Sequence, residues 1–348
     1  MTEIAKALDR SSFEPHIGAF RPEGMRSDEL RASGIPVVQF PVMSYKSPSF
    51  LKPMADIVRY VGRNTIRAVH TWDYPTGVSI IPTIRLFTSA VAVASLRGHR
   101  ELTPPGYRLA TRISDRFANG IVVNCEFLRQ RLVDENVPLA KILLCYNGID
   151  IPRFRRADGP KPAALEPASI VIGTVCSLRR EKDVPTLIDA FARVRDLLHG
   201  MMLVIVGSGP ELNSWQQYAG GRGVRQVCHF EPATQDVSRW LSAMDIFVLP
   251  SRTEAFSNAL MEAMASRCCV VASRVGGNPE LIRHGETGLL FEAGDSQSLA
   301  EQLAFLIQHP GQQRVLAESG ERYIQSFSID NAARNMEQIY CKLLSLNH

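Results

Sequence analysis

The amino-acid sequence predicts an α/β protein with two doubly wound domains, each built on a parallel sheet. Short runs rich in β-branched residues alternate with amphipathic helical stretches almost throughout the chain, and parallel strands covered by helices produce this alternation. The length of 348 residues suffices for two domains of ordinary size. A segment with neither period, "RRADGPKPAALEPAS" near residues 155–168, separates the strand-like runs into two sets.

Each strand is predicted from a short apolar run bounded by glycine, proline or polar residues. In the first half, the runs lie at residues 14–20, 66–72, 90–96, 120–126 and 141–147. In the second half, they lie at residues 169–178, 201–209, 226–231, 245–251, 268–273 and 288–293. We therefore expect a first domain over residues 1–160, a second over 161–325, and a last helix within 326–348 that returns to the first domain. The two domains are expected to face each other across a cleft.

The beginning of the chain is unusual for such a domain. An α/β domain ordinarily opens with a strand whose carboxyl end leads through a glycine turn into the first helix. Here "TEIAKALDR" already has a helical period from residue 2. The run at residues 14–20 would then be the second strand of its domain, and the first strand would be lacking. We expect a short upstream segment that encodes this strand and a glycine-rich turn.

Composition excludes several classes of protein. The chain is 45% hydrophobic and 21% charged, as globular proteins are. Its most apolar stretch, residues 78–96, is interrupted by Pro82 and Arg85 and does not resemble a membrane span. The first residues lack the apolar core of a signal peptide, which predicts a cytoplasmic protein. The seven cysteines form no C-x-x-C pair, so buried thiols are expected rather than a disulfide framework or a metal site.

The charge is distributed unevenly along the chain. Residues 1–160 contain 22 Lys and Arg against 15 Asp and Glu, whereas the remainder contains 17 against 20. Basic clusters at 97–100 and 153–156 suit either ordinary solvation or an anionic partner. Two interpretations therefore stay open for the basic half: a solvated surface, or peripheral binding to the anionic inner face of a membrane. No nucleic-acid partner is expected.

Two carboxylates stand out in "SRTEAFSNALMEAMA", where Glu254 and Glu262 lie eight positions apart. Eight helical steps return to within about 80° of the starting direction, two turns along the axis. This spacing places Glu254 near the mouth of the helix and Glu262 inside it, so that both face one cleft at different depths. An ordinary helix, with one acid in its first turn and one on its wet face, explains the same spacing.

Three other segments of the second half place glycine or basic residues where strands end. They are "LVIVGSGPE", "SLRREKDVPTL" and "SRVGGNPELI", and open α/β sheets bind ligands at the carboxyl ends of their strands. The candidate ligand-binding residues in these segments are Arg179, Lys182, Gly207, Gly209, Gly276 and Gly277. Each segment taken alone also fits a tight turn or a solvated basic loop.

These motifs together resemble a known family. "PSRTEAFSNALMEAMA" followed by "VVASRVGGNPELIRHGETGLLFEAGD" is similar to the donor-binding region of the retaining glycosyltransferases of family 4, the group 1 glycosyl transferases. The resemblance extends through "VGSGPEL", "LSAMDIFVLPS", "NGIVVNCEFLRQRLV" and "CYNGIDIPRF", and so covers nearly the whole chain. It implies the GT-B fold, in which two Rossmann-like domains face a cleft.

The resemblance also implies roles for particular residues. Glu262 would accept hydrogen bonds from the ribose hydroxyls of a sugar nucleotide, and Glu254 would lie beside the transferred sugar. The backbone amides of Phe256, Ser257 and Asn258 would point at sugar and phosphate from a helix N-terminus, whose partial positive charge stabilises a departing diphosphate. The resemblance gives Lys182 the role of adding a full charge to that leaving group.

Two positions depart from the family pattern. Relatives usually carry Gly-Arg where this chain has Cys176 and Ser177, and the nearby Arg179 is a candidate to compensate. In the first domain, relatives often place a histidine against the donor sugar, where this chain has Arg97, followed by His99. Arg97 could bind phosphate or an anionic acceptor, but it cannot act as a base because it stays protonated. His99 is a catalytic candidate with an ordinary strand-end alternative.

The expected function is transfer of a sugar from a nucleoside-diphosphate sugar to a glycan, lipid-linked or small-molecule acceptor, with retention of anomeric configuration, as in polysaccharide biosynthesis. The sugar nucleotide is a co-substrate, no cofactor is implied, and the lack of a D-x-D pair makes a catalytic metal unnecessary. One alternative is a sugar-nucleotide epimerase of the same fold, which would need acids gathered in the first domain. Another is a protein that binds the donor without turnover because its first strand is lacking.

Overall fold

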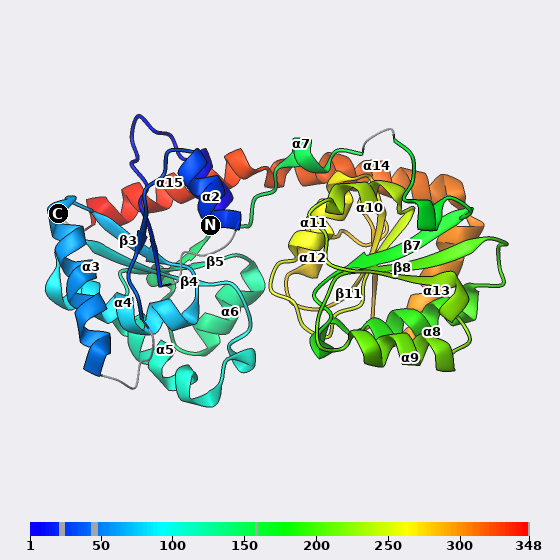
Figure 1. Cartoon of the computed structure of the whole chain (residues 1–348), viewed down its shortest axis with the longest axis horizontal. Coiled ribbons are helices and arrows are strands. Elements are labelled where there is room, and N and C mark those ends of the chain that lie inside the picture. Colours follow the sequence, from blue (N-terminus) through cyan, green and yellow to red (C-terminus); the bar gives the residue numbers. More distant parts are fainter. Residues whose placement is uncertain (21–24, 43–47, 157–158, 347–348) are drawn as a thin grey trace. The chain divides into compact units, whose positions relative to one another are not determined.

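The computed structural model describes residues 1–20, 25–42, 48–156 and 159–346, and the chain divides into two compact units. The first unit comprises Met1–Gly148 and Ile329–His348, and the second comprises Ile149–Ser328. Figure 1 shows helices packed around a sheet in each unit. Both units have parallel strands, which confirms the predicted fold class.

The strands of the first unit form two sheets among the described residues. A two-stranded sheet pairs β1 (Ile17–Ala19) with β2 (Val37–Gln39), and a four-stranded sheet has the order β3-β4-β5-β6. The strands of the larger sheet are β3 (Ala68–Thr71), β4 (Val91–Leu96), β5 (Gly120–Val123) and β6 (Ile142–Leu144). In the described part of the chain, β1 and β3 each pair with one neighbour only. The sequence analysis predicted all of these strands except β2.

The helices of the first unit include both ends of the chain. They are α1 (Thr2–Ala7), α2 (Met25–Ala32), α3 (Leu51–Arg63), α4 (Tyr74–Phe87), α5 (Pro105–Phe117), α6 (Glu126–Asp134) and α15 (Ile329–Ser345). α1 packs against α15. Ile4 of α1 and Met336 of α15 share one apolar cluster with Val91 and Val93 of β4. The last helix therefore contributes to the core of the first unit.

The second unit contains a six-stranded parallel sheet with the order β12-β11-β10-β7-β8-β9. Its strands are β7 (Ile170–Val175), β8 (Met201–Val206), β9 (Cys228–Glu231), β10 (Ile246–Leu249), β11 (Cys269–Ser273) and β12 (Leu289–Phe291). Its helices are α7 (Ile151–Phe154), α8 (Val184–Val194), α9 (Leu212–Gly221), α10 (Val237–Ala243), α11 (Asn258–Ala265), α12 (Asn278–Leu281), α13 (Ser296–Gln308) and α14 (Pro310–Ile324). Short 3-10 turns in the two units lie at Pro48–Phe50, Arg100–Leu102, Leu139–Lys141, Ala163–Leu165, Arg180–Lys182, Arg225–Val227 and Gln325–Phe327.

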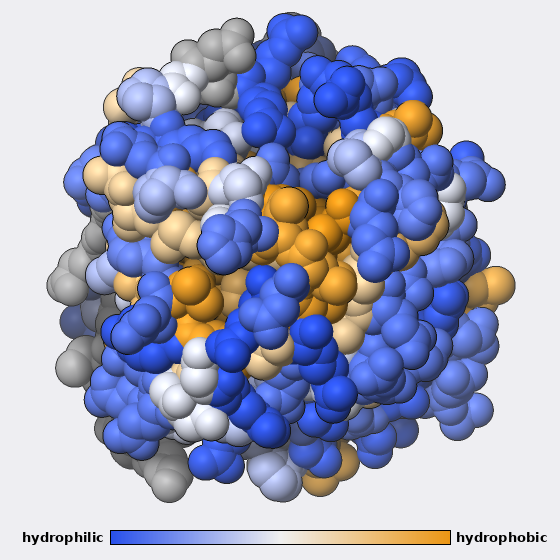
Figure 2. Space-filling model, turned by 90° about the vertical axis from the view of Figure 1, so that its right-hand side faces the viewer, coloured by the Kyte–Doolittle hydropathy of each residue, from blue (hydrophilic) through white to orange (hydrophobic). Residues whose placement is uncertain are grey.

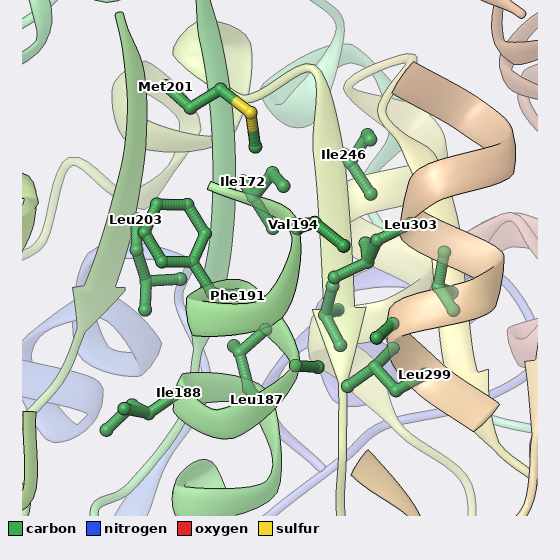
Figure 3. Close-up of a cluster of buried hydrophobic side chains, with 14 of the residues drawn as sticks. Ile172, Leu187, Ile188, Phe191, Val194, Met201, Leu203, Ile246, Leu299 and Leu303 are labelled. Carbon is green, nitrogen blue, oxygen red and sulfur yellow. The ribbon is translucent and has the colours of Figure 1, made fainter. Parts of the chain in front are cut away.

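A dense apolar core holds the second unit together. Figure 3 shows Phe191 and Leu187 of α8 among Ile172, Leu203 and Ile246 of three neighbouring strands. These side chains are almost completely buried, and burying one of this size stabilises the fold by about 1.5–3 kcal/mol. The sheet is therefore a rigid base for the loops at its carboxyl edge.

The surface and the cysteines call for no special explanation. Figure 2 shows one face of the second unit, which is largely hydrophilic around a hydrophobic area. Single exposed apolar side chains such as Leu198 and Phe305 are ordinary in proteins. No helix in the described ranges combines the length and apolar character needed to cross a membrane.

The seven cysteines are free, and five are buried. Burial raises the pKa of the Cys145 thiol to about 11.

Candidate active site

The order of strands in the second unit creates a place for a ligand. β7 and β10 are adjacent in the sheet, with Ile172 opposite Ile246. The chain continues from β7 to β8 on one side and from β10 to β11 on the other. The loops that follow these two strands therefore diverge, and in open α/β sheets ligands bind in the crevice that such a reversal leaves at the carboxyl ends.

An ion pair joins the two diverging loops. Lys182, in the loop after β7, donates a hydrogen bond from Nζ to Glu254 Oε1 at 2.5 Å. Ser251, in the loop after β10, donates from Oγ to the same carboxylate oxygen at 2.7 Å. Glu254 is only 8% exposed, and the Lys182 side chain is 20% exposed. The sequence analysis gave Lys182 and Glu254 separate roles, and the structure brings the two side chains into direct contact.

Backbone and side-chain contacts hold Lys182 in this position. Arg252 N–H donates to the carbonyl oxygen of Glu181 at 2.8 Å, and Arg252 Nε lies 3.0 Å from Asp183 Oδ2. Asp183 itself has a left-handed backbone with φ of 47°, and its carboxylate accepts a hydrogen bond from Thr186 Oγ1. A non-glycine residue in this region is strained and persists only where its surroundings fix it. These contacts fix the Lys182 loop against the Glu254 loop.

The glycines of this region permit close packing of loops. A Cβ atom on Gly276, where φ is +53°, would lie 1.6 Å from the carbonyl oxygen of Glu254. A Cβ atom on Gly207 would lie 1.9 Å from the carbonyl oxygen of Cys176, and one on Gly209 would lie 2.3 Å from that of Leu178. These approaches account for the three glycines without any ligand. The backbone N–H of Gly277 donates to Ala255 at 2.7 Å, which ties the same loops together.

The helix that carries Glu262 begins later than the spacing argument assumed. α11 starts at Asn258, with Ser257 as its N-cap, and Ser257 Oγ accepts a hydrogen bond from Leu260 N–H at 3.3 Å. Glu254 lies in the loop four residues before Asn258, so the helical angle of about 80° between the two glutamates does not apply. This part of the sequence analysis was wrong. Glu262 lies within α11 and is partly exposed, whereas Glu254 is buried.

The remaining predicted residues of the second unit differ in accessibility. Phe256 is buried, and its ring packs 5.6 Å from the ring of Phe327, so its side chain has a structural role. Arg179 is exposed immediately before the 3-10 turn that contains Lys182. Asn258 is exposed at the first position of α11. Of the three residues predicted at the mouth of α11, Phe256 and Ser257 are therefore buried, and Asn258 alone is exposed.

Arg97 and His99 belong to the first unit, where they line a cavity of about 300 Å³. Arg97 directly follows β4, and Trp72 directly follows the neighbouring strand β3. The guanidinium carbon of Arg97 lies 4.4 Å from the centre of the Trp72 ring. The ring of His99 lies 5.2 Å from that of Phe127. The sequence analysis proposed roles for Arg97 and His99, and both residues line this cavity of the first unit.

Sequence reasoning did not single out Ser251, Asp183 or Trp72. Ser251 and Trp72 each stand within two residues of a strand's carboxyl end, and that position is the signal that could have found them. Asp183 shows no signal in the sequence, because its left-handed conformation becomes visible only in the folded loop.

Comparison with known proteins identifies the family. A family model described as Glycosyltransferase Family 4 matches residues 1–153, and one described as Glycosyl transferases group 1 matches residues 169–309. The chain belongs to this family of glycosyltransferases. The two matches lie on either side of the segment that the sequence analysis took as the domain linker.

Named relatives of this glycosyltransferase are distant. It is 28% identical over 221 residues to the N-acetyl-alpha-D-glucosaminyl L-malate synthase of Bacillus anthracis, a match over 61% of this chain and 58% of that protein. It is 27% identical over 299 residues to a GDP-mannose-dependent alpha-(1-6)-phosphatidylinositol monomannoside mannosyltransferase of Mycobacterium tuberculosis, a match over 80% of this chain and 76% of that protein. The chain thus spans little more than half of the first relative and about three quarters of the second.

Solved structures of other glycosyltransferases share the fold. A glycosyltransferase from Rickettsia africae has a TM-score of 0.85 at 19% identity, over 98% of this chain and 93% of that one. Anabaena Alr3699/HepE in complex with UDP-glucose has a TM-score of 0.84 at 20% identity, over 98% and 94%. At these identities the likeness shows the fold alone, which is GT-B as the sequence analysis expected.

Proposed function

We propose that this chain transfers a sugar from a nucleoside-diphosphate sugar to an acceptor hydroxyl with retention of anomeric configuration. The observation that carries the proposal is the contact between Lys182 and Glu254 where the strand order of the second unit reverses. A lysine, a carboxylate and the N-terminus of α11 there combine the groups that recognise a diphosphate and a hydroxylated sugar.

Lys182 is placed to act on the diphosphate. Its ammonium has three donors, and Glu254 takes one of them. The other donors can bind phosphate oxygens while the contact with Glu254 keeps the side chain oriented. The developing negative charge of the leaving group would be stabilised by Lys182 and by the amides at the mouth of α11. We propose that these groups stabilise the negative charge of the diphosphate without a divalent cation.

Retention is explained by a transfer on a single face of the sugar. The acceptor oxygen forms a bond to the anomeric carbon as the bond from that carbon to the diphosphate oxygen breaks. The proton of the acceptor hydroxyl passes to the departing phosphate oxygen, so no protein nucleophile or base is needed. Glu254 would bind hydroxyl groups of the transferred sugar, and Glu262 would accept hydrogen bonds from the ribose.

The names of similar proteins support a sugar-nucleotide donor. One relative is named for GDP-mannose, and one structural neighbour was solved with UDP-glucose. Other relatives are named for lipopolysaccharide core and capsular polysaccharide biosynthesis. These names favour transfer over epimerisation, and they support a glycan, lipid-linked or small-molecule acceptor.

We extend the proposal to peripheral binding at the anionic inner face of a membrane. Helix α5 presents two exposed rows at four-residue spacing: Leu109 with Ile113, and Arg108, Arg112 and Arg116. Apolar side chains beside arginines suit an interface that contains anionic lipid headgroups. The excess of positive charge in residues 1–160 would add a longer-range attraction.

A screen for donor binding tests the proposed function. Thermal unfolding of the full chain would be measured with UDP-, GDP-, ADP- and CDP-sugars, because a ligand that binds the native state raises its stability. The selected donor would then be incubated alone and with candidate acceptors. Transfer with retention is the expected result. Conversion of the donor alone to an isomer would identify an epimerase, binding without transfer to any acceptor would support a binding protein, and no stabilisation by any donor would overturn the proposal.

A further inference from the structure

Arg252 joins three loops at the carboxyl edge of the sheet in the second unit. It lies in the loop after β10, and its backbone N–H donates to the carbonyl oxygen of Glu181 at 2.8 Å. Its guanidinium Nε lies 3.0 Å from Asp183 Oδ2, in the loop after β7. A Cβ atom on Gly294, in the loop after β12, would lie 3.1 Å from Nη1 of Arg252. The guanidinium therefore lies beside both the Asp183 carboxylate and the backbone of Gly294.

The ion pair with Arg252 matters most for Asp183, because the two side chains differ in exposure. The Arg252 side chain is 62% exposed, whereas that of Asp183 is 9% exposed. The Asp183 carboxylate also accepts a hydrogen bond from Thr186 Oγ1 at 2.8 Å, but that hydroxyl carries no charge. Ion pairs between two exposed side chains contribute little, whereas a buried carboxylate that loses its counter-ion is costly. Arg252 therefore stabilises the buried position of Asp183.

The backbone of Asp183 in turn determines where Lys182 points. Asp183 is the single residue between the 3-10 turn Arg180–Lys182 and the start of α8 at Val184. Its φ of 47° is left-handed, a conformation that a residue other than glycine keeps only where its surroundings fix it. If residue 183 returned to a more common conformation, the peptide before it would turn, and the Lys182 ammonium would leave Glu254.

We propose that Arg252 is a positioning residue for Lys182. It holds Asp183 in the left-handed conformation, and this conformation keeps the Lys182 ammonium beside Glu254. The inference rests on the proposed function, because it concerns the lysine assigned there to the leaving group. Arg252 acts through Asp183 and is assigned no contact with sugar or phosphate. Its loss should therefore disturb Lys182 even when no ligand is bound.

The test measures how readily the Lys182 ammonium reacts in the absence of ligand. The full chain would be treated with a limiting amount of an acetyl N-hydroxysuccinimide ester, and mass spectrometry of its peptides would give the acetylation rate of each lysine. Lys182 should react slowly in the parent, because its side chain is 20% exposed and bound to a carboxylate. In Arg252→Met the rate should rise about tenfold, since a charge-assisted hydrogen bond is lost. Lys141 and Lys342, in the first unit, should keep the rates of the parent.

Variants on both loops assign the effect to the pair of Arg252 and Asp183. Arg252→Lys keeps a cation opposite Asp183 and should retain most of the protection of Lys182. Asp183→Asn removes the charge but keeps the shape, and asparagine tolerates the left-handed region, so Lys182 should react as fast as it does in Arg252→Met. The double variant should react no faster than the faster single variant, because both substitutions break one interaction. Arg222→Met, which removes an arginine paired with Asp189 in the same unit, should leave the Lys182 rate unchanged.

Diphosphate binding connects the inference to the proposed reaction. Calorimetry would measure the binding of UDP, GDP, ADP and CDP and of the corresponding nucleosides, which lack the diphosphate. Arg252→Met should lower the affinity for the diphosphate that binds the parent by about threefold to tenfold, because Lys182 is no longer directed at it. The affinity for the matching nucleoside should stay the same, and equal changes in both would overturn the inference. If none of the four diphosphates binds the parent, the proposed function fails, whereas the acetylation rates still report whether Arg252 positions Lys182.

Three results from the acetylation rates would overturn the proposal. The first is an unchanged Lys182 rate in an Arg252→Met variant that thermal unfolding shows to be folded. The second is an equal rise at all lysines, which would indicate a general loosening of the fold rather than a change at Lys182. The third is a double variant in which the two single effects multiply, because Arg252 would then not act through Asp183. If Arg252→Met does not fold, Asp183→Asn makes the same comparison from the other loop.

Discussion

Lys182 donates a hydrogen bond to Glu254 across 72 positions of sequence, at a distance of 2.5 Å. The contact links the loops after β7 and β10, the two strands at which the sheet order reverses. Ser251 donates to the same carboxylate oxygen. This pair of side chains holds the two loops together, and Lys182 supplies the charge for the proposed reaction. Experiments on either residue must therefore separate stability from catalysis.

Lys182→Ala should impair both properties. Removing the ammonium leaves the buried Glu254 carboxylate without its counter-ion, which should destabilise the protein by about 2–4 kcal/mol. Turnover should fall by a larger factor than donor affinity does, because the charge on the diphosphate grows as it leaves. Urea unfolding and steady-state kinetics would measure the two effects.

A double variant provides the control for this prediction. Lys182→Met with Glu254→Gln removes both charges, so most of the lost stability should return while turnover stays low. Turnover equal to that of the parent in either variant would show that the Lys182 loop has a purely structural role.

Glu262→Gln should weaken nucleotide binding without unfolding the protein. The side chain is partly exposed on α11, so its loss leaves no cavity in the core. Losing the negative charge that accepts from ribose hydroxyls should cost about 1.5–3 kcal/mol of binding free energy. Calorimetry with the nucleoside diphosphate measures this change, and Glu301→Gln on the exposed side of α13 is the matched control. An affinity identical in both variants and the parent would contradict the assignment of Glu262.

Helix α5 should direct binding to anionic vesicles. The full chain should sediment with vesicles that contain anionic lipid and less so as salt increases, since charges are screened over about 8–10 Å at moderate ionic strength. Leu109→Ser with Ile113→Ser should reduce this binding, because both apolar side chains are exposed. Val315→Ser, at an exposed site of the second unit, should not. Equal recovery with neutral and anionic vesicles would argue against membrane binding.

His70 predicts a dependence of stability on pH. Its pKa is about 3 in the folded chain and about 6.5 in the unfolded chain. Between these values the unfolded state binds the additional proton, so stability falls as pH falls, by about 1.4 kcal/mol per pH unit. The stability lost between pH 6.5 and 4.5 should therefore be about 2–3 kcal/mol smaller in His70→Gln than in the parent.

Urea unfolding of the first unit at both pH values would measure this difference. His309→Gln, at an exposed position, should show the same pH dependence as the parent. If His70→Gln also follows the parent, His70 does not hold its neutral state in the folded chain.

The sequence predicted what depends on local pattern. The apolar runs at 169–178 and 245–251 became β7 and β10, since their period and bounding residues determine strands locally. The strand β2 (Val37–Gln39) was not predicted, although other strands of three residues, such as β1 and β6, were. Lys182 was found from its position in a loop at the carboxyl end of a strand, whereas Glu254 was found from its spacing to Glu262 and from the family resemblance.

Contacts between residues far apart in the chain could not be predicted from the sequence. The start of α11 was misplaced because the spacing argument put Glu254 and Glu262 on one helix, whereas Ser257 caps α11 through a hydrogen bond from Leu260 N–H. Likewise, nothing in "SLRGHR" shows that Arg100 is paired while Arg97 is not. That distinction arises because Asp115 and Glu135 fold against Arg100 from other elements.

Gly276 should tolerate no side chain. Gly276→Ala would place a Cβ atom 1.6 Å from the carbonyl oxygen of Glu254, in a backbone with φ of +53°. We expect a loss of about 2–4 kcal/mol in unfolding free energy. Because the Glu254 loop must move, the folded variant should also bind the donor more weakly than the parent does. Gly285→Ala is the control: its φ is +81°, but no atom lies within 4 Å of the added Cβ. It should cost only the backbone strain, about 1–2 kcal/mol. Similar losses in the two variants would show that the close approach to Glu254 does not determine the choice of glycine at position 276.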